Sequence, residues 1–541
     1  MNFKSSELFN EYEIKLLAPF VTNTDQSIFA LKNLPEVIKG ALFSRYSRSK
    51  LGLRSLLLKE FICSAESGFN EMAKNVSDKE IFKEDYIKKA QDFYDRVLDG
   101  YGDDSIGELG GAHLALEDIS ILATKVLEDA RIGGSPLEKS TRYIYFDEKI
   151  NGDYRFLKEP VLMDSPFKEL YLSTCRFLFD TYSSLVKPLS SYVEKMNPAE
   201  TDPVSPAYKT SVRARVCDSL RGLLPTSTLT NMGIFGNGRF FESLLQRLSV
   251  SNLQEIQEIG NRAFQELQKV VPSFIRRADS SHRHYTSWSE FFHKQEAHLK
   301  QAAEKIIVSL HEHTPPSLES VRLTDHDKDA EWKVAAALLY PHVSFSLSEL
   351  RQQMHSSSGY RWKDLFQTLA NERQNRRHKP PRALEHADYT FDLLADFGMF
   401  RDLHRHRILT QERQKLSTSL GYMVPEDVLM SGLEKPYRSA LDQAASAYEK
   451  INVHFPHEAQ YVVPLAYRIR WYFKINLRSL IWMCELRSMP QGHIHYRKMA
   501  QEIARKVMEV HPGFIPFFKF MDFDDHALGR LDQEKKKGNK N

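Results

Sequence analysis

The sequence reads LRGLLPTSTLTNMGIFGNGRFFESLLQRL at residues 220–248, and a related pattern, AQYVVPLAYRIRWYFKINLRSLIWMCELR, follows at residues 459–487. Identical residues recur 239 positions apart in the two stretches: Pro225 and Pro464, Asn237 and Asn476, Arg239 and Arg478. Because the matches keep one order and one spacing, we interpret the protein as a tandem repeat of one folding unit whose two copies have diverged.

A second pair of matching stretches lies upstream of the first. Residues 105–120 read SIGELGGAHLALEDIS and residues 382–397 read RALEHADYTFDLLADF, which places Glu108 277 positions before Glu385. This spacing exceeds the downstream one by 38 residues, so the first half contains additional chain. We expect part of it in the polar, proline-containing stretch 187–206.

The pattern of apolar residues predicts mostly helix with a few strands. Apolar and polar side chains alternate between Ala387 and Leu393, which is typical of a half-buried strand, and after Gly398 the period becomes helical up to Arg405. The fold class that we expect is α+β and helix-rich, with two tandem repeats. An amphipathic helix is also predicted between the halves from the spacing of Phe292, Leu299, Ile306 and Leu310.

Four segments follow from these patterns. We expect a first repeat over residues 1–280, a linker with the amphipathic helix over residues 281–319, and a second repeat over residues 320–520. The polar, lysine-rich end of the chain suggests a mobile tail over residues 521–541.

Composition excludes several classes of protein. The 541 residues are 42% hydrophobic and 27% charged, which is typical of a globular protein rather than a disordered or collagen-like chain. A net charge of +3 gives no reason to expect a nucleic-acid partner. No stretch is long and apolar enough for a membrane span, and residues 1–10 lack the apolar core of a secretory signal. The four cysteines form no CxxC pair, so we expect a protein of the reducing cytoplasm.

The run His404-Arg405-His406-Arg407 is the most unusual local feature. Adjacent like charges repel, so the run needs solvent, an acidic partner or an anionic ligand. Guanidinium groups bind phosphate through paired hydrogen bonds, which favours a phosphate or pyrophosphate ligand. Composition alone favours a solvated helix end, where cations also interact well with the free carbonyl groups. The residues around the run favour the phosphate-binding interpretation instead.

The residues around this run resemble the flavin-dependent thymidylate synthase family. That family has Arg-His-Arg, a spacer, Glu-x-Ser-x-Arg-Tyr, and a later helix of the form Asn-x-Arg-Ser-Leu…Leu-Arg. The second half has Arg-His-Arg at residues 405–407 and the helix motif from Asn476 to Arg487. The first half matches Glu-x-Ser-x-Arg-Tyr in full at residues 138–143.

The resemblance covers about residues 20–275 and 320–515. It implies two repeats of the family's fold, a small antiparallel sheet with long helices. Family members are homotetramers whose sites form between subunits. A duplicated chain is therefore expected to be a homodimer that forms a pseudo-tetramer.

The two halves have kept different pieces of the family's motifs. Residues 417–422 of the second half have lost Glu-x-Ser-x-Arg-Tyr, and residues 130–132 of the first half have lost Arg-His-Arg. An arginine before the helix-opening proline survives only as Arg221, where the second half has Gln460. The arginine that closes the last helix survives as Arg487. These complementary losses predict composite sites that take residues from both halves.

The resemblance implies conversion of dUMP to dTMP, with methylenetetrahydrofolate as the carbon donor and FAD, reduced by NADPH, as the hydride carrier. It implies that Arg487 is catalytic and stabilises negative charge on the pyrimidine. Cofactor binding is implied for Arg405, His406, Arg407, Asn476, Arg478 and His386. Binding of dUMP is implied for Glu138, Ser140, Arg142, Arg221 and Ser419.

Structural roles and other functions remain open for these residues. Arg478 could pair with an acid, and Asn237 and Asn476 could cap helices. Asp402 stands where the family has a glutamine, which keeps open a catalytically degenerate flavin- or nucleotide-binding protein of the same fold. A metal enzyme ranks last, since HExxH is absent and most of the four His-x-His pairs fall on expected helices or linkers. We therefore expect no metal site.

Overall fold

The computed structural model describes residues 4–5, 7–47, 49–62, 107–130, 132–199, 205–311, 317–356, 362–406 and 408–538. Two compact units can be distinguished, and each collects segments that are distant in sequence. The first contains Met1–Asp118, Val126–Glu138 and Asn231–Thr314, and the second contains Ile119–Lys125, Lys139–Thr230 and Pro315–Asn541. The compact units therefore differ from the two sequence repeats, because much of the first repeat belongs to the second unit.

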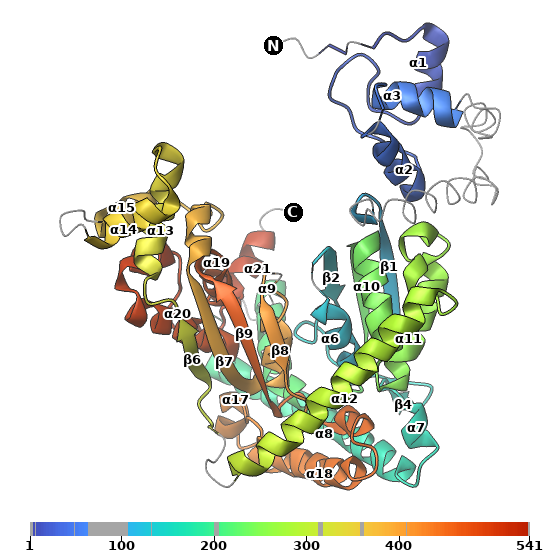
Figure 1. Ribbon diagram of the computed structural model, residues 1–541. Helices are drawn as coiled ribbons and strands as arrows, with labels where there is room; N and C mark the ends of the chain where they lie inside the picture. The colour runs from blue at the N-terminus through green and yellow to red at the C-terminus, as the bar shows by residue number, and fades with distance from the viewer. Residues whose placement is uncertain are drawn as a thin grey trace. The chain divides into compact units, whose positions relative to one another are not determined.

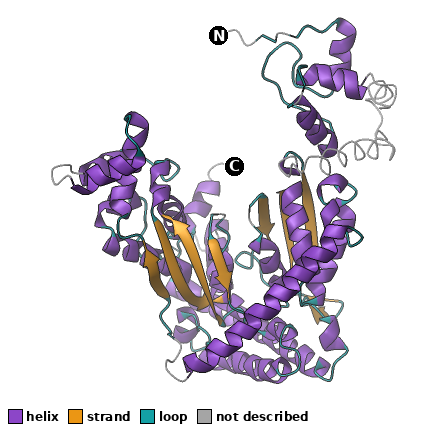
Figure 2. Cartoon of the chain, viewed as in Figure 1, coloured by secondary structure: helices purple, strands orange, loops and turns teal. Residues whose placement is uncertain are grey.

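Helices predominate in both units, and the strands form small antiparallel sheets (Figure 2). The α+β, helix-rich class expected from the sequence is thus confirmed.

Most of a three-stranded sheet with the order β1-β5-β2 lies in the first unit. Figure 1 labels its strands β1 and β2. The strands are β1 (Gly111–Ser120), β2 (Gly134–Glu138) and β5 (Leu229–Asn237), and β2 runs antiparallel to β5. Asn237 follows β5 and accepts a hydrogen bond from the backbone of Phe240, which caps the next helix. The helical elements of this unit are α1 (Glu11–Leu17), α2 (Glu36–Tyr46), α3 (Leu53–Leu56), η1 (Leu57–Ile62), α10 (Gly238–Ser249), α11 (Gln254–Leu267), η4 (Pro272–Phe274), η5 (Arg276–Ala278) and α12 (Arg283–His311). A further helix, α6 (Ile121–Asp129), belongs in part to each unit.

The second unit contains a four-stranded antiparallel sheet with the order β6-β7-β9-β8. Its strands are β6 (Val321–His326), β7 (Asp388–Asp396), β8 (Thr410–Arg413) and β9 (Arg468–Asn476). The alternation that predicted a strand after residue 386 is confirmed, since Tyr389, Phe391 and Leu393 of β7 are all buried. The described part of this unit also contains a two-stranded ribbon of β3 (Lys149–Ile150) and β4 (Asp153–Tyr154).

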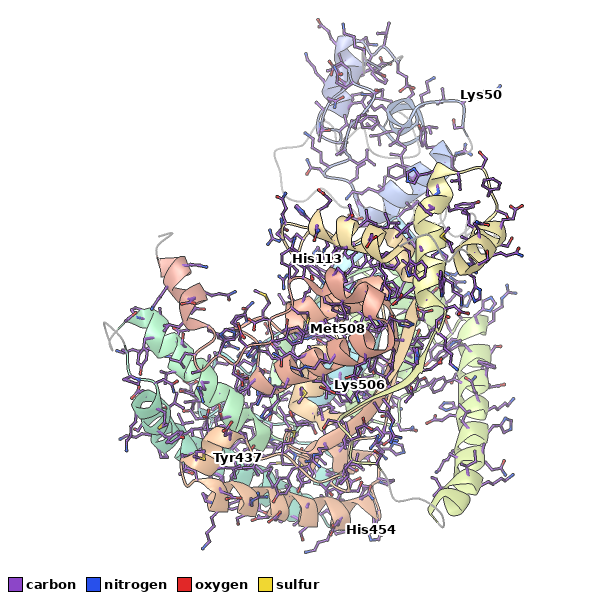
Figure 3. The ribbon with its side chains drawn as sticks, turned by 90° about the vertical axis from the view of Figure 1, so that its left-hand side faces the viewer. Lys50, His113, Tyr437, His454, Lys506 and Met508 are labelled. Carbon is purple, nitrogen blue, oxygen red and sulfur yellow. The ribbon has the colours of Figure 1, made fainter. Side chains whose placement is uncertain are left out.

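Helices of both sequence halves pack together in the second unit. α8 (Lys168–Met196) and α9 (Pro206–Leu220) come from the first half, and α18 (Glu434–Asn452) of the second half packs against α8. α8 has 29 residues and α18 has 19, so α8 holds part of the additional chain of the first half. Figure 3 shows Tyr437 and His454 near the two ends of α18, and Lys506 and Met508 on α20 (Ile494–Val510). The other helical elements are α7 (Pro160–Met163), η3 (Arg221–Leu223), α13 (Ala330–Leu339), η6 (Tyr340–His342), α14 (Leu347–Ser356), α15 (Trp362–Asn371), η7 (Arg382–His386), α16 (Phe397–Leu403), α17 (Glu426–Met430), η8 (Glu458–Val462), α19 (Leu477–Arg487), α20 (Ile494–Val510), η9 (Pro512–Phe518) and α21 (Leu531–Gly538).

The two halves meet at equivalent positions. Pro225 and Pro464, which match in the sequence repeat, form an antiparallel bridge. Thr226 donates its backbone N–H to the carbonyl of Val463 at 3.0 Å, and Leu465 donates to the carbonyl of Leu224 at 2.9 Å. An antiparallel pairing of equivalent residues requires a local two-fold axis between the two copies.

The end of the chain differs from the expected mobile tail. Arg530 is only 7% exposed, and its Nε donates to the carbonyl of Gln491 at 3.2 Å. Asp522 accepts a hydrogen bond from Nη2 of Arg497 at 3.1 Å. Residues 522–530 therefore pack against the start of α20, because they supply acceptors and donors that buried arginines require.

Candidate functional site

Guanidinium groups from both halves of the sequence converge in the second unit around two acidic side chains. This arginine cluster consists of Arg142, Asp218 and Arg221 from the first half and Asp402, Arg405 and Arg487 from the second half. All six residues belong to one compact unit of one chain. The structure thus brings together residues that carry different family motifs in the two halves.

Asp402 connects the two halves of the arginine cluster and is 6% exposed. One carboxylate oxygen accepts a hydrogen bond from Nη1 of Arg221 at 3.0 Å, and the other accepts one from Nη2 of Arg405 at 2.9 Å. Burial works to raise the pKa of Asp402, but the charges of Arg221, Arg142, Arg405 and Arg487 hold the pKa well below its usual range. Asp402 is therefore ionised and cross-links an arginine of each half.

Arg142 is held on two sides. Its Nε and Nη2 donate to the two carboxylate oxygens of Asp218, both at 2.7 Å, and its Nη1 donates to the hydroxyl of Tyr496 at 2.9 Å. Burial works to raise the pKa of Asp218, yet the charge of Arg142 lowers it. This bidentate pair fixes the orientation of the guanidinium plane.

Arg487 lies at the end of α19 and contacts two side chains. Its Nε donates to Nε2 of His406 at 3.1 Å, so this nitrogen of the imidazole is an unprotonated acceptor. The guanidinium carbon lies 5.6 Å from the centroid of the Tyr496 ring. Burial lowers the pKa of Arg487, and the charge of Asp402 opposes this effect. Tyr496 therefore contacts both Arg487 of the second half and Arg142 of the first half.

The strand-to-helix turn after β7 positions the second-half residues. Asp396 caps α16 by accepting a hydrogen bond from the backbone of Met399 at 2.8 Å. A Cβ at Gly398 would lie 3.0 Å from Oδ1 of Asp396 and 3.3 Å from Nε of Arg221. Glycine at this position lets the turn approach the arginine closely. α16 then ends at Leu403, which brings Asp402 and Arg405 to the cluster.

The connection between α19 and α20 positions Tyr496. A Cβ at Gly492 would lie 2.7 Å from Cε2 of Tyr496, so a larger residue would displace the ring. His493 caps α20, and its Nε2 lies 3.3 Å from the carbonyl oxygen of Asp218. Burial lowers the pKa of His493 well below its usual range, which favours the neutral imidazole.

A cavity of about 420 Å³ adjoins the arginine cluster. Its size is typical of a small-molecule site. Asp218 and Arg530 line it, together with Arg215, Lys498 and the residues that begin α20. The N-terminal end of a helix carries partial positive charge, so this wall adds to the attraction for an anion.

The chemistry of the cluster favours an anionic ligand. Four guanidinium groups face two carboxylates, which leaves an excess of positive charge. Nη2 of Arg221 is buried and finds no acceptor among the residues that the structure describes. A buried donor without an acceptor is unfavourable by about 1–3 kcal/mol. Phosphate oxygens are suitable acceptors for such a group.

Two of the expected cofactor residues, Asn476 and Arg478, have structural contacts, and a third, His386, lies at the surface. Oδ1 of Asn476 accepts a hydrogen bond from the backbone of Ser479 at 2.9 Å and caps α19, as Asn237 caps α10. Arg478 donates from Nη1 to Glu385 and from Nε to the carbonyl of Pro380, both at 2.8 Å. His386 ends η7 and is exposed. None of these contacts joins the arginine cluster.

The remaining candidates are placed as follows. Ser140 accepts a hydrogen bond from the backbone of Arg142 at 3.2 Å and so lies beside the cluster. Glu138 ends β2 in the first unit. Ser419 is exposed and lies 2.8 Å from Ser417, hydroxyl to hydroxyl. Arg407 lies outside the described residues.

Sequence reasoning missed three residues of this region. Asp218 pairs with Arg142 across 76 residues, so the spacing of Asp218 along its own helix gave no indication of this partner. Tyr496 and Arg530 belong to no motif, and their contacts with Arg142 span 354 and 388 residues. No local signal in the sequence indicates such contacts.

Neither a metal-ligand cluster nor a membrane-spanning helix is found in the part of the chain that the structure describes. It contains no group of three or more His, Cys, Asp or Glu side chains that could hold a metal ion. None of its helices is long and apolar enough to cross a membrane.

The structure contains two diverged copies of one unit, and arginines of both copies lie together in the arginine cluster. The chain belongs to the family described as thymidylate synthase complementing protein, whose model matches residues 61–273 and 322–513. The two matches confirm the tandem duplication and the resemblance to flavin-dependent thymidylate synthases.

Similar proteins align with nearly the whole chain. The UPF0159 protein of Chlamydia muridarum is 50% identical over 530 residues, which cover 98% of each chain. The UPF0159 protein of Chlamydia pneumoniae is 50% identical over 531 residues, again 98% of each chain. A UPF0159 protein of Thermoplasma acidophilum is 33% identical over 92% of this chain and 98% of its own.

Among the solved structures that align with the chain is a UMP/dUMP methylase PolB from Streptomyces cacaoi bound with 5-Br dUMP. It is 18% identical and covers 37% of this chain and 95% of its own, with a TM-score of 0.29.

Proposed function

We propose that the protein is an enzyme that methylates dUMP to dTMP, with methylenetetrahydrofolate as the carbon donor and FAD, reduced by NADPH, as the hydride carrier. Membership of the family supports this proposal. The observation that carries it is the arginine cluster, in which Arg142 and Arg221 of the first half lie with Arg405 and Arg487 of the second half around Asp402.

The phosphate of dUMP would bind Arg142, Arg221 and Ser140. Ion pairs with Asp218 and Asp402 hold the two guanidinium groups in position before the ligand arrives. Nη2 of Arg221 offers a buried donor that a phosphate oxygen would accept. We retain Glu138 and Ser419 as proposed contacts of dUMP.

Arg487 would be the catalytic residue that stabilises negative charge developing on the pyrimidine. Its partners His406 and Tyr496 hold the guanidinium in one orientation, so little reorganisation is needed as charge develops. Partial burial strengthens the electrostatic interaction. This combination of fixed orientation and low dielectric suits a transition-state contact.

FAD would be held by Arg405, His406, Arg407, Asn476, Arg478 and His386. The guanidinium of Arg405 is suited to bind the pyrophosphate of FAD, because guanidinium groups bind phosphate oxygens well. Its side chain is 30% exposed, so a ligand can reach it, and an ion pair with Asp402 holds it in position. When bound, FAD supplies hydride transfer. The cap at Asn476 uses its oxygen, so its amide nitrogen would serve the cofactor.

A spectroscopic titration followed by an assay tests the proposal. The purified protein should show, or acquire with FAD, a two-band flavin spectrum that shifts on addition of dUMP. It should then form dTMP from dUMP, methylenetetrahydrofolate and NADPH. Arg487→Ala should abolish dTMP formation, whereas Arg247→Ala, near the end of the equivalent helix α10, should retain it. A protein that takes up no FAD would overturn the flavoenzyme assignment.

A second candidate is a catalytically degenerate protein that binds flavin or nucleotide. The observation that favours it is the ion-paired Asp402, which occupies a position where the family has a glutamine and engages both Arg221 and Arg405. Tight binding of dUMP and FAD without turnover would support this candidate over the enzyme. Under either candidate function, we expect two copies of the chain to form a homodimer. Because each chain contains two repeats, this homodimer would be a pseudo-tetramer.

A further inference from the structure

The segment that follows the second family match carries a buried arginine, Arg530. The match ends at residue 513, so Arg530 belongs to no part of the family motifs. Its carbonyl accepts a hydrogen bond from the backbone of Glu534 at 3.0 Å as α21 begins, and α21 packs against α9. A Cβ at Gly529 would clash with the carbonyl of Pro490, so glycine lets the chain pass close to the start of α20. These contacts fix the position of Arg530 within the second unit.

The guanidinium of Arg530 has one nitrogen that its neighbours do not use. Nε donates to the carbonyl of Gln491 and Nη1 donates to the carbonyl of Arg142, both at 3.2 Å. Nη2 is buried and finds no hydrogen-bond acceptor among the residues that the structure describes. Oδ2 of Asp218 lies 3.7 Å from this nitrogen, which is too far for a hydrogen bond. A buried charged donor is unfavourable until it is paired, so a ligand that supplies an acceptor here would bind favourably.

Arg530 lines the cavity of about 420 Å³ beside the arginine cluster. Two carboxylates in the same wall are already neutralised, because Asp218 accepts two hydrogen bonds from Arg142 and Asp427 accepts two from Arg215. Further charged side chains of the wall are exposed to solvent, which screens them: Glu426, Lys498 and Asp525. Arg530 therefore offers the cavity a buried positive charge with an unused donor.

Arg530 also lies close to an arginine that we assign to the nucleotide. Oδ2 of Asp218 is 2.7 Å from Nη2 of Arg142 and 3.7 Å from Nη2 of Arg530, so both guanidinium groups approach one oxygen. Burial lowers the pKa of Arg530, and the charge of Arg142 lowers it further. An anion that contacts both groups would offset this repulsion. A phosphate group has several acceptor oxygens, so it can bind two neighbouring guanidinium groups at once.

We propose that Arg530 is a further substrate-binding residue, whose Nη2 donates a hydrogen bond to the phosphate group of the nucleotide held by Arg142. This role rests on the proposed function, because dUMP is taken as the ligand. A neutral nucleoside gains nothing from a charged donor at this place, whereas a nucleoside monophosphate does. Arg530 thus selects the nucleotide over the nucleoside, and a segment outside the family match contributes to the specificity of the site.

A comparison of dUMP with deoxyuridine tests this role in the full chain. Isothermal titration measures the dissociation constant of dUMP, ligand-observed NMR measures that of deoxyuridine, and their ratio reports the phosphate contacts. Arg530→Gln should weaken dUMP binding about 10- to 100-fold and leave deoxyuridine binding within about twofold, so the preference for the nucleotide falls accordingly. Arg505→Gln makes the same change of charge at an arginine of α20 that is 47% exposed, and it should keep the wild-type ratio.

Arg530→Lys separates a phosphate contact from a role in holding the backbone. Lysine keeps a charge that can reach the phosphate, but its single ammonium cannot replace the guanidinium fork at the carbonyls of Gln491 and Arg142. The ratio should therefore stay within about threefold of wild type. A ratio as low as that of Arg530→Gln, or an unchanged ratio in Arg530→Gln, would overturn the role of Arg530 alone. A wild type that binds no dUMP would overturn the proposed function and this role with it.

Discussion

Replacing Asp402 by asparagine should have opposite effects on stability and on nucleotide binding. The side chain of Asp402 is 8% exposed and that of Arg221 is 4% exposed, so their ion pair is buried. Removal of one partner from a buried pair lowers the free energy of unfolding by about 3–5 kcal/mol. Asparagine keeps one oxygen acceptor at the same place, so we expect a loss of about 3 kcal/mol.

Binding of dUMP should become tighter in the same variant. The carboxylate of Asp402 opposes a phosphate that shares Arg221, and two charges about 8 Å apart repel by about 2 kcal/mol at an effective dielectric constant of about 20. Loss of this repulsion should lower the dissociation constant of dUMP by roughly 10- to 30-fold. Urea denaturation and isothermal titration with dUMP measure the two effects separately.

The control for this variant is Asp392→Asn. Asp392 pairs with Arg470, but the two side chains are 31% and 16% exposed, so the change should reduce stability by less than about 1 kcal/mol. Weaker dUMP binding in Asp402→Asn would refute the electrostatic argument and would indicate a direct contact between the carboxylate and the pyrimidine. An unchanged urea midpoint would refute the buried ion pair.

The stability difference should also depend on pH. Because the folded-state pKa of Asp402 is depressed, its stabilisation is fully present above the unfolded-state pKa of about 3.9 and is lost as the pH falls through the folded-state pKa. The difference between wild type and Asp402→Asn should therefore be constant near neutral pH and decrease below about pH 4. Denaturation midpoints measured between pH 3 and pH 7 check this direction.

Three further variants test separate contacts. Tyr496→Phe removes the hydroxyl that accepts from Arg142 but keeps the ring, so the dissociation constant of dUMP should rise about tenfold while the flavin spectrum stays unchanged. Arg221→Ala should abolish dUMP binding in a titration, whereas Gln460→Ala at the equivalent position should leave it within about twofold; equal effects would contradict the composite site. Asn476→Ala and Asn237→Ala should each lower the free energy of unfolding by about 1 kcal/mol through loss of a helix cap. Because only Asn476 is proposed to contact the cofactor, only Asn476→Ala should also weaken FAD binding.

The sequence was sufficient for features that depend on local pattern. Strand β7 followed from the alternation around Phe391, and the repeat followed from pairs such as Pro225 and Pro464, which the structure places face to face. The composite cluster was expected because the two halves lost complementary motifs. Each of these inferences rests on spacing within a few residues or on comparison of the chain with itself.

Other features depend on contacts that no local pattern specifies. Tyr496 reaches Arg142 across 354 residues, and its ring fits only because Gly492 leaves space. Asn476 resembles a cofactor residue in the family motif, but its backbone position at the start of α19 also makes it a helix cap. The end of the chain was expected to be mobile from its charge, yet Arg530 is buried against carbonyl groups. Charge composition cannot indicate such acceptors, because they come from distant backbone.

The central claim is that one nucleotide site is built from both halves of the chain. Isothermal titration of dUMP against wild type, Arg142→Ala and Arg487→Ala tests it most directly. The account predicts one dUMP per chain in wild type, severe loss of dUMP binding in Arg142→Ala, and loss of dTMP formation with weaker dUMP binding in Arg487→Ala, although the two arginines belong to different repeats. Two dUMP molecules per chain, or unimpaired binding in the first-half variant, would contradict the account.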